Sequence, residues 1–129
     1  MINTGILNPR ILSLLARIRH TNALVISDRS FPFWPQIETV DISVVDDLPT
    51  VLQLIAAVLA NHNFTQACMA REFQKNNSAA TRASFAKALA GVPTKFEPHV
   101  DFKKRVPDAI GLIRTGDTTQ YANVILISG

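Results

Sequence analysis

Hydrophobic positions follow a helical period near the start of the chain and an extended one shortly after it. Residues 11–18 place leucine and isoleucine three and four positions apart, which makes one apolar stripe along a helix. Asn8 and Pro9 stand just before the stripe, and both residue types favour a helix start. Residues 23–28, ALVISD, are apolar through Ile26 without alternation, which is typical of a strand buried on both faces. The pattern therefore predicts a helix followed by a buried strand.

The rest of the chain continues this alternation. Two prolines in FPFWP remove backbone donors, so residues 31–35 are expected to form a stiff loop. Residues 46–63 begin with two aspartates and Pro49 and end in an Asn-rich stretch, which predicts a helix. A starting serine, many alanines and a final glycine predict another helix at 77–91. Further strands are expected at 40–45, 64–70, 109–116 and 121–129, a short extended segment at 95–99 and a short helix at 100–106.

Helices that alternate with strands predict an α/β sandwich. A chain of 129 residues is long enough to bury one core and too short for two, so residues 1–129 are expected to form a single domain. Hydrophobic residues make up 47% of the chain and charged residues only 18%. This is more apolar than a small monomer needs, and surface buried between subunits would account for the excess.

Charge, cysteine content and hydropathy exclude several function classes. The 13 basic and 10 acidic residues are spread thinly, without interleaved aromatic residues, so no nucleic-acid partner is expected. The single cysteine, Cys68, is expected to pack in the core and fits a reducing compartment. The longest apolar stretch, VLQLIAAVLA, has ten residues, about half a membrane span. Since the N-terminus also lacks the features of a secretory signal, we expect no membrane and a cytoplasmic location.

Familiar catalytic motifs are absent. The sequence contains no glycine-rich phosphate loop, no paired Cys/His spacing for a metal and no nucleophile elbow. His62 stands at the expected end of a helix and is interpreted as a solvated residue. The polar residues that remain gather at predicted strand ends: His20, Asp28, His99, Arg114, Asp117, Tyr121 and Asn123.

These polar residues also have ordinary structural explanations. His20 follows a predicted helix and would complement the negative end of its dipole. Asp28 would cap the turn after its strand, and His99, which follows a proline, would be an exposed loop residue. Tyr121 and Asn123 alternate on a predicted strand and would form an edge pair. Their positions alone do not decide between these interpretations and a shared site.

Three segments together resemble one known family. They are GILNPRILSLLARIRHTNALVISD at 5–28, VDISVVDDLPTVLQLIAAVLA at 40–60 and IRTGDTTQYANVILISG at 113–129. In this order and spacing they are similar to the RbsD/FucU family of D-ribose pyranases and L-fucose mutarotases. Within that family, the histidine at 99 and the YAN sequence at 121–123 resemble the ribose branch more closely. The resemblance covers essentially the whole chain. It implies a sandwich whose central, mostly parallel sheet is flanked by helices.

The resemblance also implies an activity and a set of site residues. The reaction interconverts cyclic forms of a free monosaccharide such as D-ribose, either pyranose and furanose or α and β anomers, without a cofactor or a metal. His20 matches the family's catalytic histidine. The family's substrate-binding positions correspond here to Asp28, His99, Tyr121, Ala122 and Asn123.

The chemistry of ring opening suits these residue types. A proton must leave the anomeric hydroxyl while another reaches the ring oxygen, and a histidine can carry either charge state near neutral pH. A carboxylate accepts hydrogen bonds from sugar hydroxyls, while tyrosine and asparagine both donate and accept. Because sugars mutarotate unaided in water, proton transfer worth roughly 10²–10⁴-fold is sufficient.

The spacing between His20 and Asp28 bears on how the site is assembled. A strand over 23–28 is roughly 17–20 Å long, which is too far for both residues to contact one five-carbon sugar. Either the chain folds back before Ala23, or neighbouring subunits share the site. The family that the chain resembles forms ring-like oligomers with clefts near subunit contacts. We therefore expect a homo-oligomer with sites near its interfaces.

The sequence departs from the family pattern beside these residues. The usual GHTD is RHTN here, so Arg19 and Asn22 leave no carboxylate next to His20. The usual DAG is DRS, followed by the bulky FPFWP, a loop expected near the sugar. Arg29 would reach an anionic substituent there, or Trp34 would stack on a sugar face. Two alternatives therefore stay open beside a mutarotase: a non-catalytic monosaccharide-binding or transport-accessory subunit that uses the same cleft, and a structural oligomer with a degenerate site.

Overall fold

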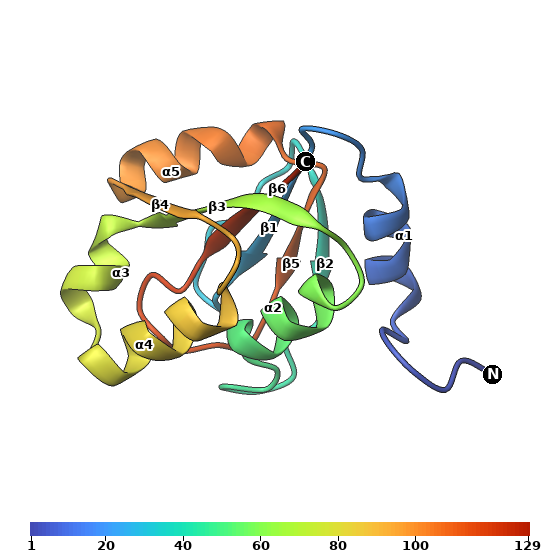
Figure 1. Ribbon diagram of the computed structural model, residues 1–129, viewed down its shortest axis with the longest axis horizontal. Helices are drawn as coiled ribbons and strands as arrows, with labels where there is room; N and C mark the ends of the chain where they lie inside the picture. Colours follow the sequence, from blue (N-terminus) through green and yellow to red (C-terminus); the bar gives the residue numbers. More distant parts are fainter.

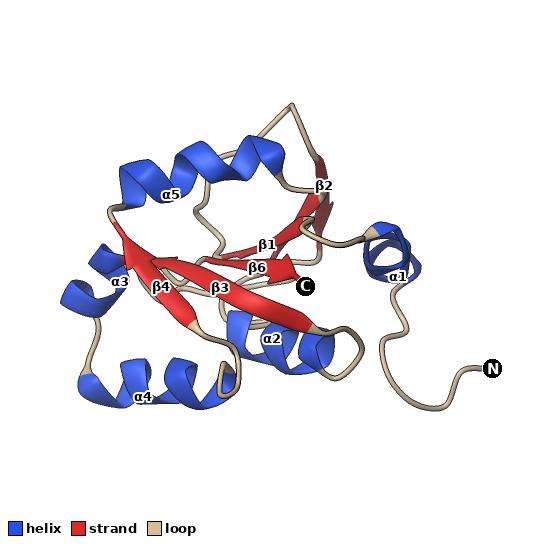
Figure 2. Cartoon of the chain, turned by 45° about the horizontal axis from the view of Figure 1, so that its top comes forward, coloured by secondary structure: helices blue, strands red, loops and turns tan.

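The computed structural model describes residues 1–129 and contains a sheet between two layers of helices (Figures 1 and 2). The strands are β1 (Ala23–Ser27), β2 (Glu38–Asp41), β3 (Phe64–Ala70), β4 (Thr94–Glu97), β5 (Gly111–Arg114) and β6 (Val124–Ser128). Their order across the sheet is β2-β5-β1-β6-β3-β4, and every neighbouring pair is parallel except the two that involve β6. The expected α/β fold with a mostly parallel sheet flanked by helices is confirmed.

The helices cover the sheet unequally. They are α1 (Pro9–Arg17), α2 (Val51–Leu59), α3 (Arg71–Asn76), α4 (Ala79–Ala88) and α5 (His99–Arg105), followed by the 3-10 turn η1 (Val106–Asp108). Figure 2 shows α5 alone on one face of the sheet and α2 and α4 on the opposite face. The larger hydrophobic core joins α1, α2, α3 and α4 to that opposite face, and the smaller core lies beneath α5. None of the helices has the length and hydrophobicity needed to cross a membrane.

Strand β1 lies in the middle of the sheet and contributes to both cores. Leu24 and Ile26 point into the larger core, and Val25 points into the smaller one. All three are fully buried, as the unbroken apolar pattern predicts. Each such side chain stabilises the fold by about 1.5–3 kcal/mol through its burial. The strand therefore holds the loops at its two ends firmly apart.

Two predicted helix starts are confirmed at the level of hydrogen bonds. The Asn8 side chain accepts bonds from the N–H groups of Arg10 at 2.9 Å and Ile11 at 3.1 Å, which caps α1. The Ser78 hydroxyl accepts the Thr81 N–H at 3.1 Å and caps α4 in the same way. Both caps satisfy backbone donors that the first turn of a helix leaves free.

The segment around residues 40–50 differs from the prediction. Strand β2 ends at Asp41 instead of continuing to residue 45, and α2 begins at Val51 instead of at the aspartates. Thr50 caps α2, because its hydroxyl accepts the Gln53 N–H while the Gln53 side chain accepts the Thr50 N–H. The aspartate at position 47 instead accepts two hydrogen bonds from Thr118, so it joins two loops and does not start a helix.

Four other elements also differ. Helix α3 was not expected, because it directly follows β3 and buries only Phe73, which leaves no apolar period to detect. The last predicted strands at 109–116 and 121–129 are shorter, since β5 covers four residues and β6 begins at Val124. His99 is the first residue of α5 and does not belong to an extended segment.

Gly116 allows the loop before α2 to approach the end of β5. Its N–H donates to the Pro49 carbonyl at 3.0 Å. A Cβ atom at this position would lie 2.3 Å from the Val45 carbonyl oxygen and 2.9 Å from that of Leu48. Glycine is therefore required here by a close backbone contact, which holds the loop beside residues 117 and 118.

We expect Gly116→Ala to lower the free energy of unfolding by about 1–3 kcal/mol, because the added methyl group forces two backbone segments apart. Urea denaturation measures this. Gly91→Asn is the matched control, since Gly91 has φ +84° with open space around it, and asparagine tolerates this conformation at a cost within about 0.5 kcal/mol. A Gly116→Ala protein that unfolds at the wild-type urea concentration would contradict the contact.

Candidate functional site

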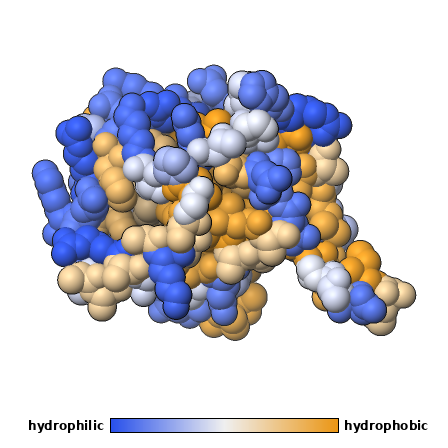
Figure 3. All heavy atoms as spheres, in the orientation of Figure 1, coloured by the Kyte–Doolittle hydropathy of each residue, from blue (hydrophilic) through white to orange (hydrophobic).

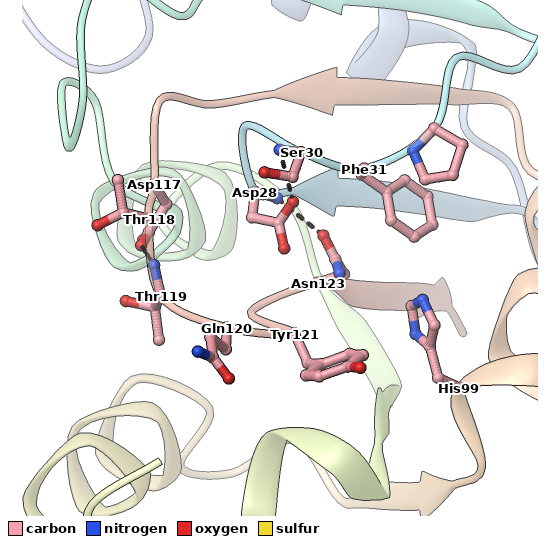
Figure 4. Close-up of a pocket in the computed structure, with 11 residues that line it drawn as sticks. Asp28, Ser30, Phe31, His99, Asp117, Thr118, Thr119, Gln120, Tyr121 and Asn123 are labelled. Carbon is pink, nitrogen blue, oxygen red and sulfur yellow. Dashed lines mark hydrogen bonds between the residues drawn. The ribbon is translucent and has the colours of Figure 1, made fainter. Parts of the chain in front are cut away.

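The carboxyl edge of the sheet holds a polar pocket of about 370 Å³ (Figure 4). Because β6 runs antiparallel, the turn before it reaches the same edge as the loops that follow the other strands. This edge is where open α/β sheets usually bind ligands. The lining residues are Asp28, Ser30, Phe31, Pro32, His99, Asp117, Thr118, Thr119, Gln120, Tyr121 and Asn123.

Asp28 forms the base of this pocket at the end of β1 and is 8% exposed. Its carboxylate accepts the Ser30 N–H at 2.9 Å, so the expected turn cap is present, and its own N–H donates to Asn123 Oδ1 at 2.8 Å. Burial raises the pKa of Asp28, and the nearby Asp117 carboxylate raises it further, against the opposing effect of these hydrogen bonds. The carboxylate is consequently a better proton and hydrogen-bond acceptor than an exposed aspartate.

His99 borders the pocket from the first turn of α5. Its N–H donates to the Glu72 carboxylate at 3.0 Å, which fixes the helix start. The ring packs edge-on against Tyr121, with 5.1 Å between ring centroids, as Figure 4 shows. Burial lowers the pKa of His99, and the Lys103 charge adds to this, so the imidazole is neutral at pH 7. Its Nδ1 atom is buried and has no hydrogen-bond partner in the protein.

Residues 121–123 lie in a turn and not on a strand, so the expectation of an alternating edge pair is wrong. Tyr121 has φ 55°, an unfavourable conformation for a large side chain. The turn is held by the Asn77 side chain, which donates to the Gln120 carbonyl at 2.8 Å. Tyr121 and Asn123 face the pocket, whereas the Ala122 side chain is fully buried in the larger core.

Arg114 fixes the loop that forms one wall of the pocket. Its guanidinium donates to the carbonyl oxygens of Phe31 at 2.5 Å and Pro32 at 3.3 Å, and its Nε lies 3.7 Å from Asp41. The Arg114 side chain is 12% exposed, so it is largely covered by the loop that it holds. Phe31 and Pro32 therefore line the pocket, as expected of this loop.

Arg29 and Trp34 were also considered for sugar contacts, and both lie outside the pocket. Arg29 pairs with Asp46 at 2.8 Å on the surface, where such a pair contributes little to stability. Trp34 packs against Phe31, with 6.0 Å between ring centroids, and lines a separate shallow hollow beside Lys103. Neither side chain therefore contacts the space around Asp28.

A buried polar network anchors α5 and so positions His99. Arg105 Nη2 donates to Glu97 Oε2 at 3.0 Å, and the Cys68 thiol donates to Glu97 Oε1 at 3.1 Å. Hydrogen bonds from Arg105 lower the pKa of Glu97. Cys68 is buried as expected, and burial together with Glu97 raises its pKa to about 12.

His20 lies at the opposite end of β1. It is exposed and lines a second hollow of about 510 Å³, which we call the His20 hollow. The other lining residues are Ile18, Arg19, Leu59, Ala60, Asn61, His62, Asn63, Ser128 and Gly129. The turn at residues 19–22 does not carry His20 to the other end of β1, and His20 and Asp28 line two separate hollows of one subunit.

One of the two departures beside His20, Asn22, has a structural explanation. The Asn22 side chain accepts the Arg19 N–H at 2.8 Å and closes the turn that presents His20, a contact that an amide oxygen makes as well as a carboxylate.

His62 was expected to be solvated, and this is wrong. It is half-buried, and its Nε2 lies 3.1 Å from the Ser128 hydroxyl.

Several pocket residues were not identified from the sequence. Thr118, Thr119 and Gln120 were assigned to a turn, and the order of strands in the sheet is what brings them opposite Asp28. Asp117 has structural contacts as well, because its carboxylate accepts the N–H groups of Val51 and Thr119 at 2.8 Å. No group of three His, Cys, Asp or Glu side chains is arranged to hold a metal ion.

A pocket dominated by hydrogen-bonding groups at this edge is typical of α/β proteins that bind a small polar molecule. The profile of the RbsD / FucU transport protein family matches residues 1–129. The chain is 36% identical to a D-ribose pyranase of Laribacter hongkongensis, over 100% of this chain and 98% of that protein. It is 38% identical to a D-ribose pyranase of Chromobacterium violaceum, over 97% and 95% of the two chains. The chain therefore belongs to the RbsD / FucU family.

Solved structures agree with this assignment. Bacillus subtilis RbsD, determined in complex with D-ribose, superposes with a TM-score of 0.93 at 29% identity, covering 100% of this chain and 98% of that one. The fucose mutarotase of Streptococcus pneumoniae, determined with L-fucose, has a TM-score of 0.80 at 18% identity, covering 95% and 92% of the chains. The second match is evidence for the fold alone.

Removing the Arg114 guanidinium should loosen the pocket wall. In Arg114→Met, the carbonyl groups of Phe31 and Pro32 lose a charged donor, and the first of these bonds is partly buried, so the free energy of unfolding should fall by about 1–3 kcal/mol. Backbone N–H groups of residues 29–31 should exchange with solvent faster, as hydrogen-exchange NMR would measure. Arg17→Met is the control, because Arg17 forms a surface pair with Glu38 that contributes less than about 1 kcal/mol. Unchanged exchange in Arg114→Met would contradict the role.

Proposed function

We propose that this protein is a sugar mutarotase of the D-ribose pyranase type, which interconverts cyclic forms of a free monosaccharide such as D-ribose. The observation that carries the proposal is the whole-chain match, in sequence and fold, to D-ribose pyranases and to an RbsD structure that contains D-ribose. The Asp28 pocket supports it independently, because its side chains offer the donors and acceptors that a polyhydroxylated ligand requires.

Each of the proposed binding residues has a distinct part. Asp28 accepts hydrogen bonds from sugar hydroxyls, and its raised pKa strengthens this acceptor. Neutral His99 can both donate and accept, and a ligand hydroxyl would relieve its unpartnered nitrogen. Tyr121 and the amide of Asn123 bind further hydroxyls, with Ala122 contributing its backbone. An unpaired polar group in such a pocket is costly, which favours ligands with several hydroxyls.

His20 is the proposed proton carrier. The neutral imidazole takes the proton of the anomeric hydroxyl as the bond between C1 and the ring oxygen breaks, and the imidazolium returns that proton to the ring oxygen, directly or through a water molecule that passes on one of its own protons. The product is the open-chain aldehyde. Reclosure reverses these transfers, with either the same hydroxyl attacking the other face of C1 or a different hydroxyl attacking it. No cofactor takes part in this mechanism.

The proposed roles of His20 and of the pocket around Asp28 are compatible only if two subunits form one site. His20 lies at one end of β1 and the Asp28 pocket at the other, so the His20 of one copy must face the pocket of the next. Such head-to-tail contacts repeat from copy to copy, and they close into a ring when the rotation per copy permits it. We therefore propose a homo-oligomer in which every interface forms a site.

Exchange NMR on D-ribose tests the activity. The protein should accelerate interconversion of the pyranose and furanose forms, and His20→Ala should reduce this acceleration by about 10²–10⁴-fold while ribose still binds. Tight binding without acceleration in the wild type would instead identify a non-catalytic sugar-binding subunit. The departure of Arg19 and Asn22 from the family pattern is the reason to include this outcome.

Mixing two inactive variants tests the shared site. His20→Ala retains an intact pocket, and Asn123→Ala retains His20, so a mixed oligomer contains some interfaces with both halves intact. Random mixing at equal amounts should restore about a quarter of the wild-type activity, since each interface takes one half from each neighbour. Neither variant alone should be active. If co-assembled subunits recover nothing, His20 of one subunit does not act on a sugar bound in the pocket of its neighbour.

Replacing Asp28 should separate binding from stability. In Asp28→Asn, D-ribose affinity should fall by about 10-fold or more, because a charged acceptor is lost. The amide oxygen still caps Ser30. Since burial raises the pKa of Asp28, the ionised carboxylate is penalised in the folded protein at neutral pH, so the free energy of unfolding should not fall. NMR titration and urea denaturation measure both quantities; unchanged affinity, or clear destabilisation, would contradict this role.

A further inference from the structure

The turn that presents His20 is conformationally strained. Asn22 N–H donates to the Arg19 carbonyl at 3.0 Å, which closes a four-residue turn with His20 at its second position. Thr21, the third residue, has φ 69°, a conformation that glycine favours and that a β-branched residue adopts only under constraint. Such a residue persists only when its surroundings hold it in place. The position of His20 therefore depends on whatever holds Thr21.

Ser128, the last residue of β6, holds this turn from the neighbouring strand. Thr21 N–H donates to the Ser128 carbonyl at 2.9 Å, and Ser128 N–H donates to the Asn22 carbonyl at 2.9 Å. These two bonds continue the antiparallel ladder between β1 and β6 by one step. The last residue of a strand frays most readily, so these bonds alone give the turn a weak support.

His62 holds Ser128 from the other side. Its ring Nε2 lies 3.1 Å from the Ser128 hydroxyl, which has no other side-chain partner. Two contacts fix the ring itself: the Ser128 hydroxyl and the Phe64 ring, whose centroid is 4.6 Å away. The backbone N–H of His62 donates to the Val58 carbonyl at 3.0 Å, which fixes the main chain at this position. His62 and Ser128 both line the His20 hollow. The proposed mechanism makes no use of His62.

We propose that His62 is a positioning residue, which acts through Ser128 to keep the strained turn at Thr21 in place and His20 directed into its hollow. The expected effect of His62 on activity rests on the proposed function of His20. The expected effect of His62 on the turn at Thr21 does not depend on any activity. The charged or titratable side chains lining the His20 hollow are Arg19, His20 and His62.

Paired variants at position 62 test the proposal. His62→Leu removes the ring nitrogen, whereas His62→Gln places an amide nitrogen where Nε2 lies and retains a hydrogen bond to Ser128. In His62→Leu, kcat for D-ribose exchange should fall by up to about 10-fold with KM unchanged, the effect of one lost hydrogen bond. His62→Gln should keep most of the rate. The Thr21 N–H should exchange with solvent by up to about 10-fold faster in His62→Leu alone.

Two further variants sharpen the result. Ser128→Ala should behave like His62→Leu, and the double variant should be no worse than either, because both remove the same contact. Thr65→Ala is the control, since its hydroxyl bonds to the adjacent β6 residue, Ile127, at 3.5 Å and lies outside the hollow. It should leave both kcat and Thr21 exchange at wild-type values.

Each outcome is decisive. A KM increase at constant kcat would mean that His62 contacts the sugar, which overturns a positioning role. Equal losses of kcat in His62→Leu and His62→Gln would also overturn it. So would additive losses of kcat in the double variant. If the wild type does not accelerate sugar exchange, the proposed function fails, and the Thr21 exchange rates still decide this proposal. Wild-type Thr21 exchange in His62→Leu would overturn it.

Discussion

The burial of β1 on both faces is the constraint on which the rest of the structure depends. Its three central side chains belong to two different cores, so the strand can neither bend nor shift its register without exposing apolar surface. Consequently the residues before and after it are held at opposite edges of the sheet. His20 and Asp28 are separated by the part of the molecule that is least able to move, and no local rearrangement would bring them together.

The strand order decides what gathers at each edge. Because β6 is antiparallel to its two neighbours, the turn before it joins the loops that follow β1, β4 and β5, and its last residue joins the loops that precede β1 and β3. Both edges contain a non-glycine residue with positive φ, Tyr121 at one and Thr21 at the other. In each case hydrogen bonds from a neighbouring segment hold the strained residue. Conformational strain at both edges thus coincides with the residues assigned to chemistry.

Much of the fold could be predicted from the sequence, because it depends on local signals. The apolar run of β1, the caps at Asn8 and Ser78 and the alternation of elements all have short-range causes. Helix α3 and the loop before α2 could not be predicted. Helix α3 has almost no apolar period. The loop before α2 is shaped by its close contact with Gly116, which lies more than sixty positions further along the chain. The spacing of His20 and Asp28 predicted two separated groups because strand length is itself a local quantity.

The candidate site was predictable in part for the same reason. Polar residues at strand ends indicated Asp28, His99, Tyr121 and Asn123, whereas residues 118–120 enter the pocket through sheet order. His62 was assigned to solvent because its partner, Ser128, lies 66 positions along the chain. Tertiary hydrogen bonds of this kind leave no periodic signal in a sequence.

The contact between Cys68 and Glu97 also bears on chemical durability. Thiols react with peroxides and electrophiles as thiolates, and a pKa of about 12 leaves almost no thiolate at physiological pH. The side chain is 3% exposed, so oxidants have little access to it. Glu97, which Arg105 of the His99 helix binds, is therefore paired with a sulfur atom that resists oxidation, and the pocket is expected to keep its shape under oxidative stress that inactivates enzymes with reactive cysteines.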